Sequence, residues 1–551
     1  MLIRLTIVVL VLTSAAYPQD RSHARSMVIT REGIVATSHV QASVAGAQIL
    51  AKGGSAVDAA IAANAVLGVT EPMMNGMGGD LFAIYWDAKT GKLYGLNSSG
   101  WAPQGLTLES LKQKGVTQMP TFGIDAVTVP GAVAGWNALH NRFGKLPWNE
   151  LFKPAIHYAD RGYPVPELIH GFWEQEGISQ DPESRRVYLP DGKVPEVGQI
   201  FRNPDLAKTL RLLATGGAAA FYKGDIAQAI LATSREFGGT MAADDLAQFT
   251  PEWVDPVSTT YRGWTIYELP PNGQGMAALE MLNIMETAPA SPEGSSSVAA
   301  LHHKIEAMKL AYADLRRYNA DPRFAKVPVQ GLLSKQYAQE RARLIDPNKA
   351  SCETGAGKPP ASETTYLSVV DREGNIVSLI QSNYEAFGSG ITVRGMGFVL
   401  QDRGALFSLD PASPNVLAPR KRPFHTIIPA FMEKGDQHIG FGIMGGANQP
   451  LAHAQFASNF VDYGMNIQAA LENPRFTVSP NGGCNIVIES RVKPEVREKL
   501  SSMGHIFRVD REYSTSMGRG QAVLHNSKTG VNYGASDPRA DGSAEPEPPT
   551  Q

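Results

Sequence analysis

The sequence is poor in cysteine and carries no strong excess of charge of either sign. Only 2 of its 551 residues are cysteines, Cys352 and Cys484, and no group of cysteines and histidines has the spacing of a zinc site. The formal net charge is -3, which leaves no basic surplus for phosphates and argues against a nucleic-acid-binding protein. The two cysteines could form one disulfide in an oxidising compartment, but they lie far apart and nothing in the sequence shows that they meet.

Long apolar runs are also scarce, and the one that stands out is N-terminal, in "MLIRLTIVVLVLTSAAYPQD". Arg4 supplies the positive charge of a leader, residues 5–12 form its apolar centre, and Ser14-Ala15-Ala16 is a small-residue cleavage site. The run is far shorter than the roughly 20 residues that span a bilayer. We therefore predict a cleaved signal peptide at residues 1–16 and a secreted or periplasmic protein with no stable membrane span. An uncleaved anchor is the alternative.

Glycine and proline are plentiful, with 54 and 37 residues, and they separate a mixture of helices and antiparallel hairpins. Such a mixture predicts layered α and β structure. Ser55 and Asp58 form a capping box ahead of a small, apolar helix that should pack in the interior. We expect helices at 40–52, 55–69, 297–318 and 449–463, and strands at 27–39 (a pair), 79–100 (a hairpin), 258–271, 364–383, 396–401 and 438–444.

Two segments have the composition of exposed chain. Residues 346–363, "DPNKASCETGAGKPPASE", are rich in Pro, Gly, Ser and Lys, which is typical of an exposed loop where proteins are nicked. The acidic, proline-rich C-terminus predicts a mobile tail at residues 534–551.

The hairpin after the first of these segments begins on two adjacent threonines, in "SETTYLSVVDREGNIVSLIQSNYEAFGSG". Both arms alternate with a two-residue period, and "DREGN" is the turn, where Gly374 is free to adopt positive φ. If Asp371 pairs with Ile376, Thr364 is level with Asn383. Ser382 and Asn383 then lie beside the Thr364 hydroxyl, although a slip of one residue would change the partner.

A threonine hydroxyl is a weak nucleophile unless a base takes its proton. The residue's own α-amine, with an unperturbed pKa of about 7.7–8.0, can be that base once Thr364 is an N-terminus. Cleavage between Glu363 and Thr364 would create that N-terminus, through attack of the Thr364 side chain on the Glu363 carbonyl. The simpler interpretation is that Thr-Thr merely starts a strand, which threonine favours.

A glycine pair supplies a second feature. "HIGFGIMGGANQPLAHAQFASNFVDYG" (438–464) reads as a strand, a Gly-Gly turn and a helix. The backbone N–H groups of Gly445 and Gly446 would lie near a helix N-terminus, where such donors can stabilise the oxyanion of an acyl transfer. A tight strand-to-helix turn without function is the alternative.

These features occur within a longer series of motifs that resembles the gamma-glutamyltransferase family of N-terminal-nucleophile hydrolases. The series includes "ILAKGGSAVDAAIAANAVLGVTEP", "NGMGGDLFAIYWD", "RFGKLPWNELFKPAIHYADRGYPV", "TTYLSVVDREGNIVSL", "LAPRKRPFHTIIPA", "GGANQP" and "DPRADGSA", and it covers nearly all of the mature chain. The resemblance implies an α+β fold, a four-layer αββα sandwich. It also implies self-cleavage into a large subunit (17–363) and a small catalytic subunit (364–551) that stay together as a heterodimer.

The resemblance assigns roles in the reaction. It implies that Thr364 is the nucleophile, that Ser382 supports it, and that Gly445 and Gly446 form the oxyanion site. The glycine-rich "NGMGGD" lacks the Lys-Ser/Thr of a phosphate loop, and we interpret it as a turn lining the floor of the pocket.

The substrate-binding positions depart from the family pattern. Glutathione-cleaving relatives bind the γ-glutamyl carboxylate with an arginine of the large subunit, but the matching stretch here, "NSSGWAP" (97–103), has none. Their Asn and Asp that hold the α-amine fall on Tyr384 and Leu406, and their paired serines fall on His425 and Thr426. Arg403 could replace the missing arginine, with a surface or structural role as the alternative. The candidate substrate-binding residues are therefore Arg403, Asn383, Tyr384, His425 and Thr426.

The resemblance implies an autoprocessed γ-glutamyltransferase or glutathione hydrolase that transfers an acyl group from Thr364 to water or an amine, without metal or organic cofactor. A cephalosporin-acylase-like amidase for glutaryl or similar side chains is the alternative, because the arginine is missing. A non-catalytic binding protein of the same fold is a third hypothesis. His302, His303 and Glu306 lack the H-E-x-x-H spacing of a zinc site, and we interpret them as a cluster on a helix face.

Overall fold

The computed structural model describes residues 23–173, 178, 180–352, 363–479 and 482–549. The predicted signal peptide lies outside these residues. Among the helices within them, none has the length and apolar character needed to cross a bilayer.

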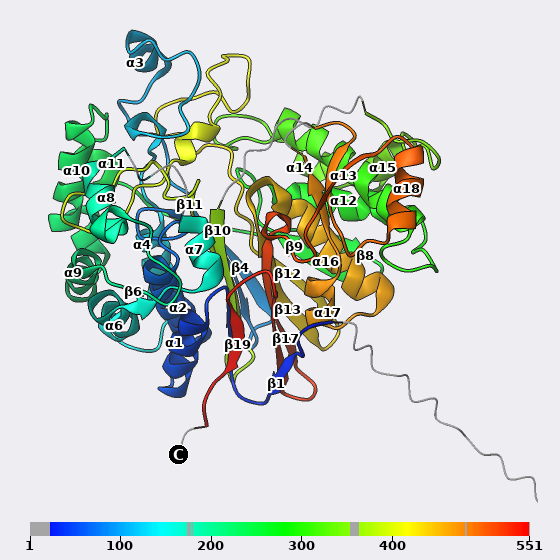
Figure 1. The fold of residues 1–551 in the computed structure, drawn as a ribbon, viewed down its shortest axis with the longest axis horizontal. Helices are drawn as coiled ribbons and strands as arrows, with labels where there is room; N and C mark the ends of the chain where they lie inside the picture. Colours follow the sequence, from blue (N-terminus) through cyan, green and yellow to red (C-terminus); the bar gives the residue numbers. More distant parts are fainter. Residues whose placement is uncertain (1–22, 174–177, 179, 353–362, 480–481, 550–551) are drawn as a thin grey trace, which may run out of the picture.

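Two seven-stranded sheets form the centre of the molecule (Figure 1). Every strand pair within these two sheets is antiparallel. The first sheet has the order β19 (Ser543–Pro546), β2 (Ile34–Thr37), β10 (Glu363–Val370), β11 (Ile376–Tyr384), β3 (Asp80–Asp87), β4 (Lys92–Ser98) and β7 (Glu252–Val254). The second has the order β1 (Val28–Thr30), β18 (Val531–Ser536), β17 (Arg519–Asn526), β13 (Gln437–Met444), β12 (Ala430–Lys434), β9 (Trp264–Glu268) and β8 (Val257–Tyr261).

The two sheets pack face to face, with β10 lying over β13. Ser368 Oγ donates a hydrogen bond to the Gly440 carbonyl at 2.9 Å. A Cβ on Gly442 would lie 2.4 Å from the ring of Tyr366, so only glycine allows this approach. These two contacts set the alignment of β10 on β13, and continuing it by two residues brings Thr364 level with Met444, at the start of the Gly-Gly turn.

Helices cover the outer face of each sheet. α1 (Val40–Ala51) and α2 (Ala56–Thr70) pack beside the first sheet, while α12 (Gly275–Met285), α13 (Val298–Tyr318) and α16 (Gln449–Tyr463) cover the second (Figure 1). The predicted capping box at the start of α2 is confirmed. The result is the four-layer αββα sandwich expected from the sequence, with one hydrophobic core under each helical layer.

The remaining elements surround these layers. They are α3 (Leu108–Gln113), α4 (Ala132–Phe143), α5 (Trp148–Leu151), α6 (Lys153–Arg161), β5 (Tyr163–Pro164), α7 (Glu167–Trp173), α8 (Pro182–Tyr188), β6 (Ile200–Phe201), α9 (Pro204–Tyr222), α10 (Asp225–Glu236), α11 (Ala243–Ala247), α14 (Val329–Leu332), α15 (Lys335–Ala342), α17 (Ile467–Glu472), β14 (Phe476–Val478), β15 (Asn485–Glu489), α18 (Pro494–Ser502) and β16 (Ile506–Asp510).

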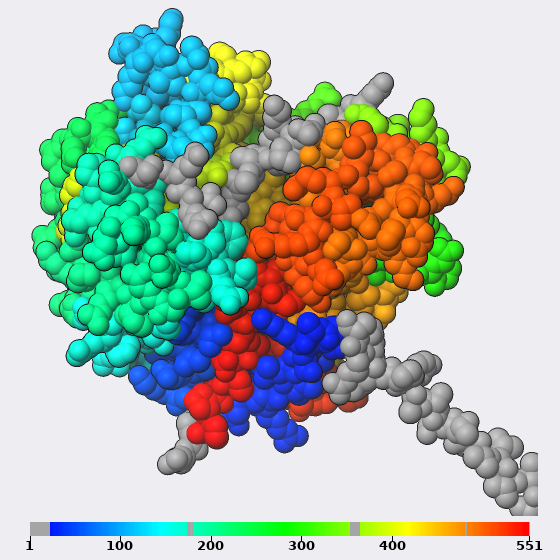
Figure 2. All heavy atoms as spheres, viewed as in Figure 1, coloured from blue at the N-terminus to red at the C-terminus, as the bar shows by residue number. Residues whose placement is uncertain are grey.

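Three expectations about strands need correction. The strands predicted within 27–39 form, but β1 and β2 belong to different sheets and do not pair with each other. Residues 396–401 form no strand; Val399 makes only an isolated bridge with Thr392. The prediction of a mobile tail at 534–551 is wrong for residues 534–536, which end β18 and pair with β17, and for residues 543–546, because β19 pairs with β2 at the edge of the first sheet. In Figure 2 these C-terminal residues (red) lie between surfaces formed by N-terminal residues (blue).

The two cysteines meet. Cys352 and Cys484 form a disulfide with their Cα atoms 4.8 Å apart, although 132 residues separate them in sequence. The disulfide that the two cysteines allowed is therefore present. Its pairing depends on tertiary contacts, in which the Ala350 N–H donates to the Met503 carbonyl and the Ile506 N–H donates to the Cys484 carbonyl.

Candidate active site

Thr364 lies at an irregularity in the β10–β11 ladder. Val370 pairs with Ile376 along the regular part of the hairpin, so the predicted pairing of Asp371 with Ile376 is wrong by one residue. The register then shifts between Glu363 and Thr365. The extra residue of this bulge lies on β11, where two residues, 382 and 383, face Thr364. Bulges of this kind redirect side chains and occur often beside active sites.

The bulge places two hydroxyl groups together. Thr364 Oγ1 donates to Ser382 Oγ at 3.2 Å, and the Tyr384 N–H donates to the same Ser382 oxygen at 2.8 Å. Thr364 and Ser382 are both fully buried. The predicted proximity of Ser382 to the Thr364 hydroxyl is therefore confirmed, while the catalytic role of each residue stays a prediction.

Asn383, the other residue of the bulge, turns toward a different segment. Its N–H donates to the Met74 carbonyl at 3.0 Å, and its Nδ2 donates to the Pro72 carbonyl at 3.3 Å. The Asn383 side chain is thus fixed against the loop before β3. Nothing in this geometry directs it toward Arg403.

The Gly445-Gly446 turn follows β13 and leads through a short 3-10 turn, Gly446–Asn448, into α16. Gly445 has φ 139° and Gly446 has φ 56°, values that favour glycine over residues with a Cβ. Gln274 Nε2 donates to the Gly446 carbonyl at 2.8 Å and to the Thr426 carbonyl at 2.6 Å. Gln274 thus ties the turn to Thr426, whose hydroxyl accepts from Arg403, while the role of the two glycines stays a prediction.

Arg403 is the most distinctive charged residue near these groups. It is fully buried, so the surface alternative is wrong. Its Nη1 donates to Thr426 Oγ1 at 2.7 Å, and its guanidinium lies 4.4 Å from the centre of the Tyr384 ring. Among the described residues, its Nε and Nη2 have no hydrogen-bond partner. Burial lowers the pKa of Arg403, and nearby carboxylates, Asp80 and Asp402 among them, favour its charged form.

A buried pair lies beside this arginine. His425 Nε2 and Asp80 Oδ2 are 3.0 Å apart, and neither side chain is exposed. Burial raises the pKa of Asp80 to about 7, against the opposing effect of Arg403. Burial, followed by the charge of Arg403, holds the pKa of His425 well below its usual value. His425 is therefore neutral. Its Nδ1 accepts from the Ile427 N–H at 3.4 Å, so the proton is on Nε2, which donates to Asp80.

Sequence reasoning missed Asp80 and Asp402. Asp80 ends "NGMGGD", and a carboxylate inside a glycine-rich turn at the start of a strand was the available signal. Asp402 is fully buried; its Oδ1 accepts from the Glu385 N–H at 3.1 Å, while its Oδ2 has no partner among the described residues. Burial, then the charge of Glu385, raises the pKa of Asp402 well above its usual value. A cation bound next to Asp402 would favour the ionised form of this carboxyl, because opposite charges attract.

Contacts link the nucleophile candidate to the arginine. Thr364 contacts Ser382, Ser382 accepts from the Tyr384 N–H, and the Tyr384 ring lies against Arg403. Tyr384 itself has φ 84°, an uncommon conformation for a bulky residue that occurs mostly where structure or function requires it. A hydroxyl and a buried cation with two free donors thus lie within one connected site.

The layers and this site define the class of protein. The fold is that of the N-terminal nucleophile hydrolases, as its similarity to solved structures shows. The chain belongs to the gamma-glutamyltranspeptidase family, whose sequence model matches residues 42–547. The resemblance and the fold class expected from the sequence are both confirmed.

Three relatives illustrate the range of the family. The chain is 37% identical over 524 residues to the glutathione hydrolase-like YwrD proenzyme of Bacillus subtilis, covering 94% of this chain and 99% of that protein. It is 34% identical over 528 residues to the oxamate amidohydrolase proenzyme of Klebsiella pneumoniae, covering 94% and 98%. The crystal structure of cephalosporin acylase from Bacillus halodurans superimposes with a TM-score of 0.88 at 41% identity, covering 98% and 99%. Proenzyme relatives indicate a hydrolase or acyltransferase made as a precursor.

Proposed function

We propose that this chain is an autoprocessed amidase that cleaves γ-glutamyl amide bonds through an acyl-threonine intermediate and passes the acyl group to water or an amine. The observation that carries the proposal is the contact between the Thr364 and Ser382 hydroxyls, linked through Tyr384 to a buried arginine with two free donors.

Processing comes first in this proposal. The Thr364 hydroxyl attacks the carbonyl carbon of Glu363, and the peptide bond breaks as its nitrogen takes a proton. The product is an ester between the two residues, which water hydrolyses to a new carboxylate on Glu363 and a free Thr364. The Thr364 hydroxyl gives up its proton along the hydrogen bond to Ser382. The cut separates residues 17–363 from residues 364–551.

Turnover then uses the freed amine. The Thr364 α-amine takes the proton of its own hydroxyl as Oγ1 attacks the amide carbon of the donor. The N–H groups of Gly445 and Gly446 stabilise the oxyanion, because donors fixed in a buried site need no reorganisation when the charge develops. The protonated amine gives its proton to the leaving nitrogen. Water or an acceptor amine opens the ester.

The charges around Arg403 select the donor. The free Nε and Nη2 of its guanidinium match the geometry of a carboxylate, which binds such a fork through two hydrogen bonds. The free Oδ2 of Asp402 offers an acceptor for an ammonium group. A γ-glutamyl group carries one of each on its α-carbon, so Arg403 and Asp402 supply the complementary pair. Thr426 and Tyr384 hold the guanidinium in place.

A glutaryl-type acyl group is the second candidate. Glutaryl keeps the distal carboxylate and lacks the amine, and two observations favour it. Tyr384 presents a ring to Arg403 where glutathione-cleaving relatives are expected to place an amide. The 41% identical structure is a cephalosporin acylase. In this case Arg403 binds the distal carboxylate, and Asp402 makes no contribution to affinity.

To decide between a γ-glutamyl and a glutaryl acyl donor, kcat/KM for γ-glutamyl-p-nitroanilide is compared with that for glutaryl-p-nitroanilide, using the purified, processed protein. The proposal predicts that the γ-glutamyl compound is the better substrate, because only it uses both charges. If only the glutaryl compound reacts, the transferase assignment is wrong and the acylase assignment replaces it. If neither reacts and the chain stays uncut, the binding-protein hypothesis is supported instead.

Export forms part of the same proposal. A secreted or periplasmic location rests on the leader pattern at residues 1–16, which lie outside the described residues. Mass analysis of the large chain tests it, with a start near residue 17 expected after cleavage of the leader. A large chain that begins at Met1 in the exported fraction would support the uncleaved anchor.

A further inference from the structure

We propose that the Cys352–Cys484 disulfide is a covalent link between the two chains that the cut produces. This inference rests on the proposed cleavage before Thr364. Cys352 precedes that cut and Cys484 follows it, so the bond joins the C-terminal end of the large chain to the small chain. The sequence has no third cysteine, which leaves no competing partner within the protein.

The large-chain side of the link is held by a buried ion pair on α13. Lys309 Nζ lies 2.7 Å from Glu306 Oε1, and both side chains are almost fully buried. Glu306 Oε2 accepts from the Ser351 N–H at 3.2 Å, and Lys309 Nζ donates to the Ser351 carbonyl at 3.0 Å. Both backbone groups of the residue before Cys352 are therefore fixed. Lys309 Nζ also lies 3.7 Å from Cys484 Sγ.

Backbone contacts then join the two sides directly. The Ala350 N–H donates to the Met503 carbonyl at 2.8 Å, and the Ile506 N–H donates to the Cys484 carbonyl at 2.8 Å. Ala350 belongs to the large chain, whereas Met503, Ile506 and Cys484 belong to the small chain. Cys484 is thus anchored to the segment that also binds residue 350.

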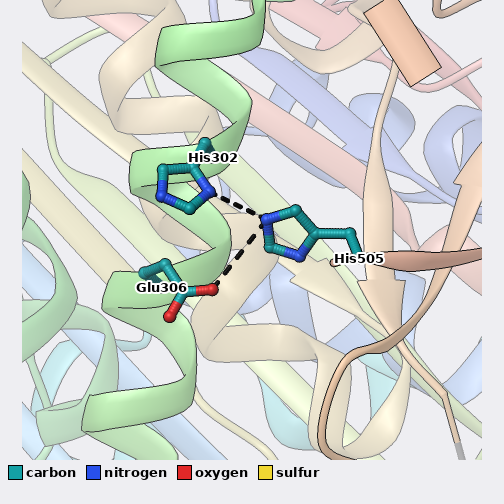
Figure 3. A group of neighbouring side chains, drawn as sticks. All are labelled: His302, Glu306 and His505. Carbon is teal, nitrogen blue, oxygen red and sulfur yellow. Dashed lines mark hydrogen bonds and ion pairs between the residues drawn. The ribbon is translucent and has the colours of Figure 1, made fainter. Parts of the chain in front are cut away.

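Figure 3 shows a third contact between the two chains, formed by His302, Glu306 and His505. His302 Nε2 donates to the Asp346 carbonyl at 2.8 Å, because a carbonyl can only accept. With Nε2 carrying the proton of a neutral ring, Nδ1 accepts from His505 Nε2, 2.8 Å away. Burial, with a contribution from Lys309, lowers the pKa of His505 to about 3, which keeps that ring neutral. A shared proton therefore lies between His302 Nδ1 and His505 Nε2.

This arrangement answers the question of a metal site. The ligand atoms of these three residues lie within 4.8 Å of one another, but the facing nitrogens of His302 and His505 already share a hydrogen bond. The ammonium of Lys309 already compensates Glu306. A cation at this point would meet that ammonium. The cluster is better explained as a contact that crosses the cut, with His302, Glu306 and Lys309 on the large chain and His505 on the small chain.

The disulfide is needed to hold the two chains together only after the protein unfolds. Strands from both sides of the cut alternate in the first sheet, where β10 and β11 lie between β2 and β3, so the folded chains hold together without the disulfide. Once the protein unfolds, only the disulfide keeps the chains in one molecule, which makes their reassociation intramolecular. We expect the processed protein to refold from denaturant independently of its concentration while the bond is intact, and to depend on concentration after reduction.

The experiment is a denaturing gel of the purified protein, alkylated before lysis and run with and without dithiothreitol. The dithiol supplies two electrons, which convert the disulfide to two thiols while the reagent closes to a cyclic disulfide. Wild type should give one full-length band without reductant and two bands with it. Cys484→Ser should give two bands in both lanes, and Thr364→Ala one band in both. If Cys484→Ser does not fold, Cys352→Ser, at an exposed position, replaces it and should also give two bands in both lanes.

Each outcome has a defined meaning. Two wild-type bands without reductant, with both cysteines alkylated, would overturn the link and leave the cut standing. One wild-type band in both lanes would overturn the cut, and with it the link between chains. A peptide map without reduction separates these results further, because the proposal requires the peptide containing Cys352 to be joined to the peptide containing Cys484.

Discussion

Thr364 Oγ1 and Ser382 Oγ lie 3.2 Å apart because β11 carries one more residue than β10 at this point of the ladder. In a regular hairpin a single residue would face Thr364. The bulge instead lets Ser382 accept from the Thr364 hydroxyl while it also accepts from the backbone of Tyr384. A backbone irregularity therefore positions the hydroxyl that we propose assists the nucleophile.

Ser382→Ala should slow both self-cleavage and turnover without unfolding the protein. In the proposed mechanism this hydroxyl takes part in proton movement at Thr364, and such assistance is typically worth about 10²–10⁴-fold in rate. Ser378→Ala is the matched control, since Ser378 is a buried serine on the same strand that bonds to Tyr366 instead. Processing followed by mass and kcat for the cleaved fraction are the measurements. Equal effects of the two substitutions would contradict the assigned role.

Arg403→Met should raise KM for carboxylate-bearing donors. The variant keeps a long side chain but loses the two free guanidinium donors, and a hydrogen bond to a charged group is worth about 1.5–3 kcal/mol, or roughly 10–100-fold in affinity. Arg403→Lys keeps the charge without the planar fork and should recover only part of the loss. Self-cleavage should be unchanged, because it involves no donor. An unchanged KM in both variants would remove Arg403 from the binding site.

Asp402→Asn should separate the two candidate donors. The substitution removes a carboxylate that can compensate an α-ammonium, so kcat/KM for γ-glutamyl-p-nitroanilide should fall by roughly 10-fold or more, as expected for loss of a charged hydrogen bond. Activity on glutaryl-p-nitroanilide, which has no amine, should stay the same or rise. Equal losses on both compounds would show that Asp402 acts through structure.

The pH profile of kcat/KM should rise through the pKa of the Thr364 α-amine, near 7.7–8.0 when unperturbed. In the proposed mechanism the neutral amine is the base, so activity should be low below this pKa and reach a plateau above it. His425 should not contribute, because burial holds its pKa well below its usual value and it remains neutral over this range. Asp80, with a pKa raised to about 7 by burial, titrates nearby, so Asp80→Asn is the control. Loss of the rising limb in that variant would assign it to Asp80.

The sequence predicted the layers well and the site in part. Alternating patterns located β10, β11 and β13, and the capping box located the start of α2. The predicted partner of Thr364 on the second arm, Asn383, was one of the two residues that face it. The bulge itself could not be predicted, since the Ser382-Asn383 pair has no glycine or other marker of an extra residue. Asp80 and Asp402 were missed because their importance depends on burial beside Arg403, which arises only when distant segments meet.

At the C-terminus, the sequence predicted mobile chain where the structure has a strand. Its proline and acidic residues are typical of mobile chain, yet backbone pairing of β19 with β2 requires no apolar side chains, and an edge strand tolerates proline. The disulfide was possible from the composition, but its formation could not be predicted, because contacts between distant segments, such as Ala350 with Met503, bring the two cysteines together. Local pattern predicted local structure, whereas contacts between distant segments decided the rest.

In the proposed mechanism one peptide bond is broken so that a freed amine activates its own hydroxyl. N-terminal sequencing of the fragments of the purified, reduced protein, combined with their intact masses, identifies the broken bond. We expect a small fragment that begins with Thr364-Thr365-Tyr366 and a large fragment that ends at Glu363. A fully active protein that is uncut, or cut at another bond, would disprove this mechanism.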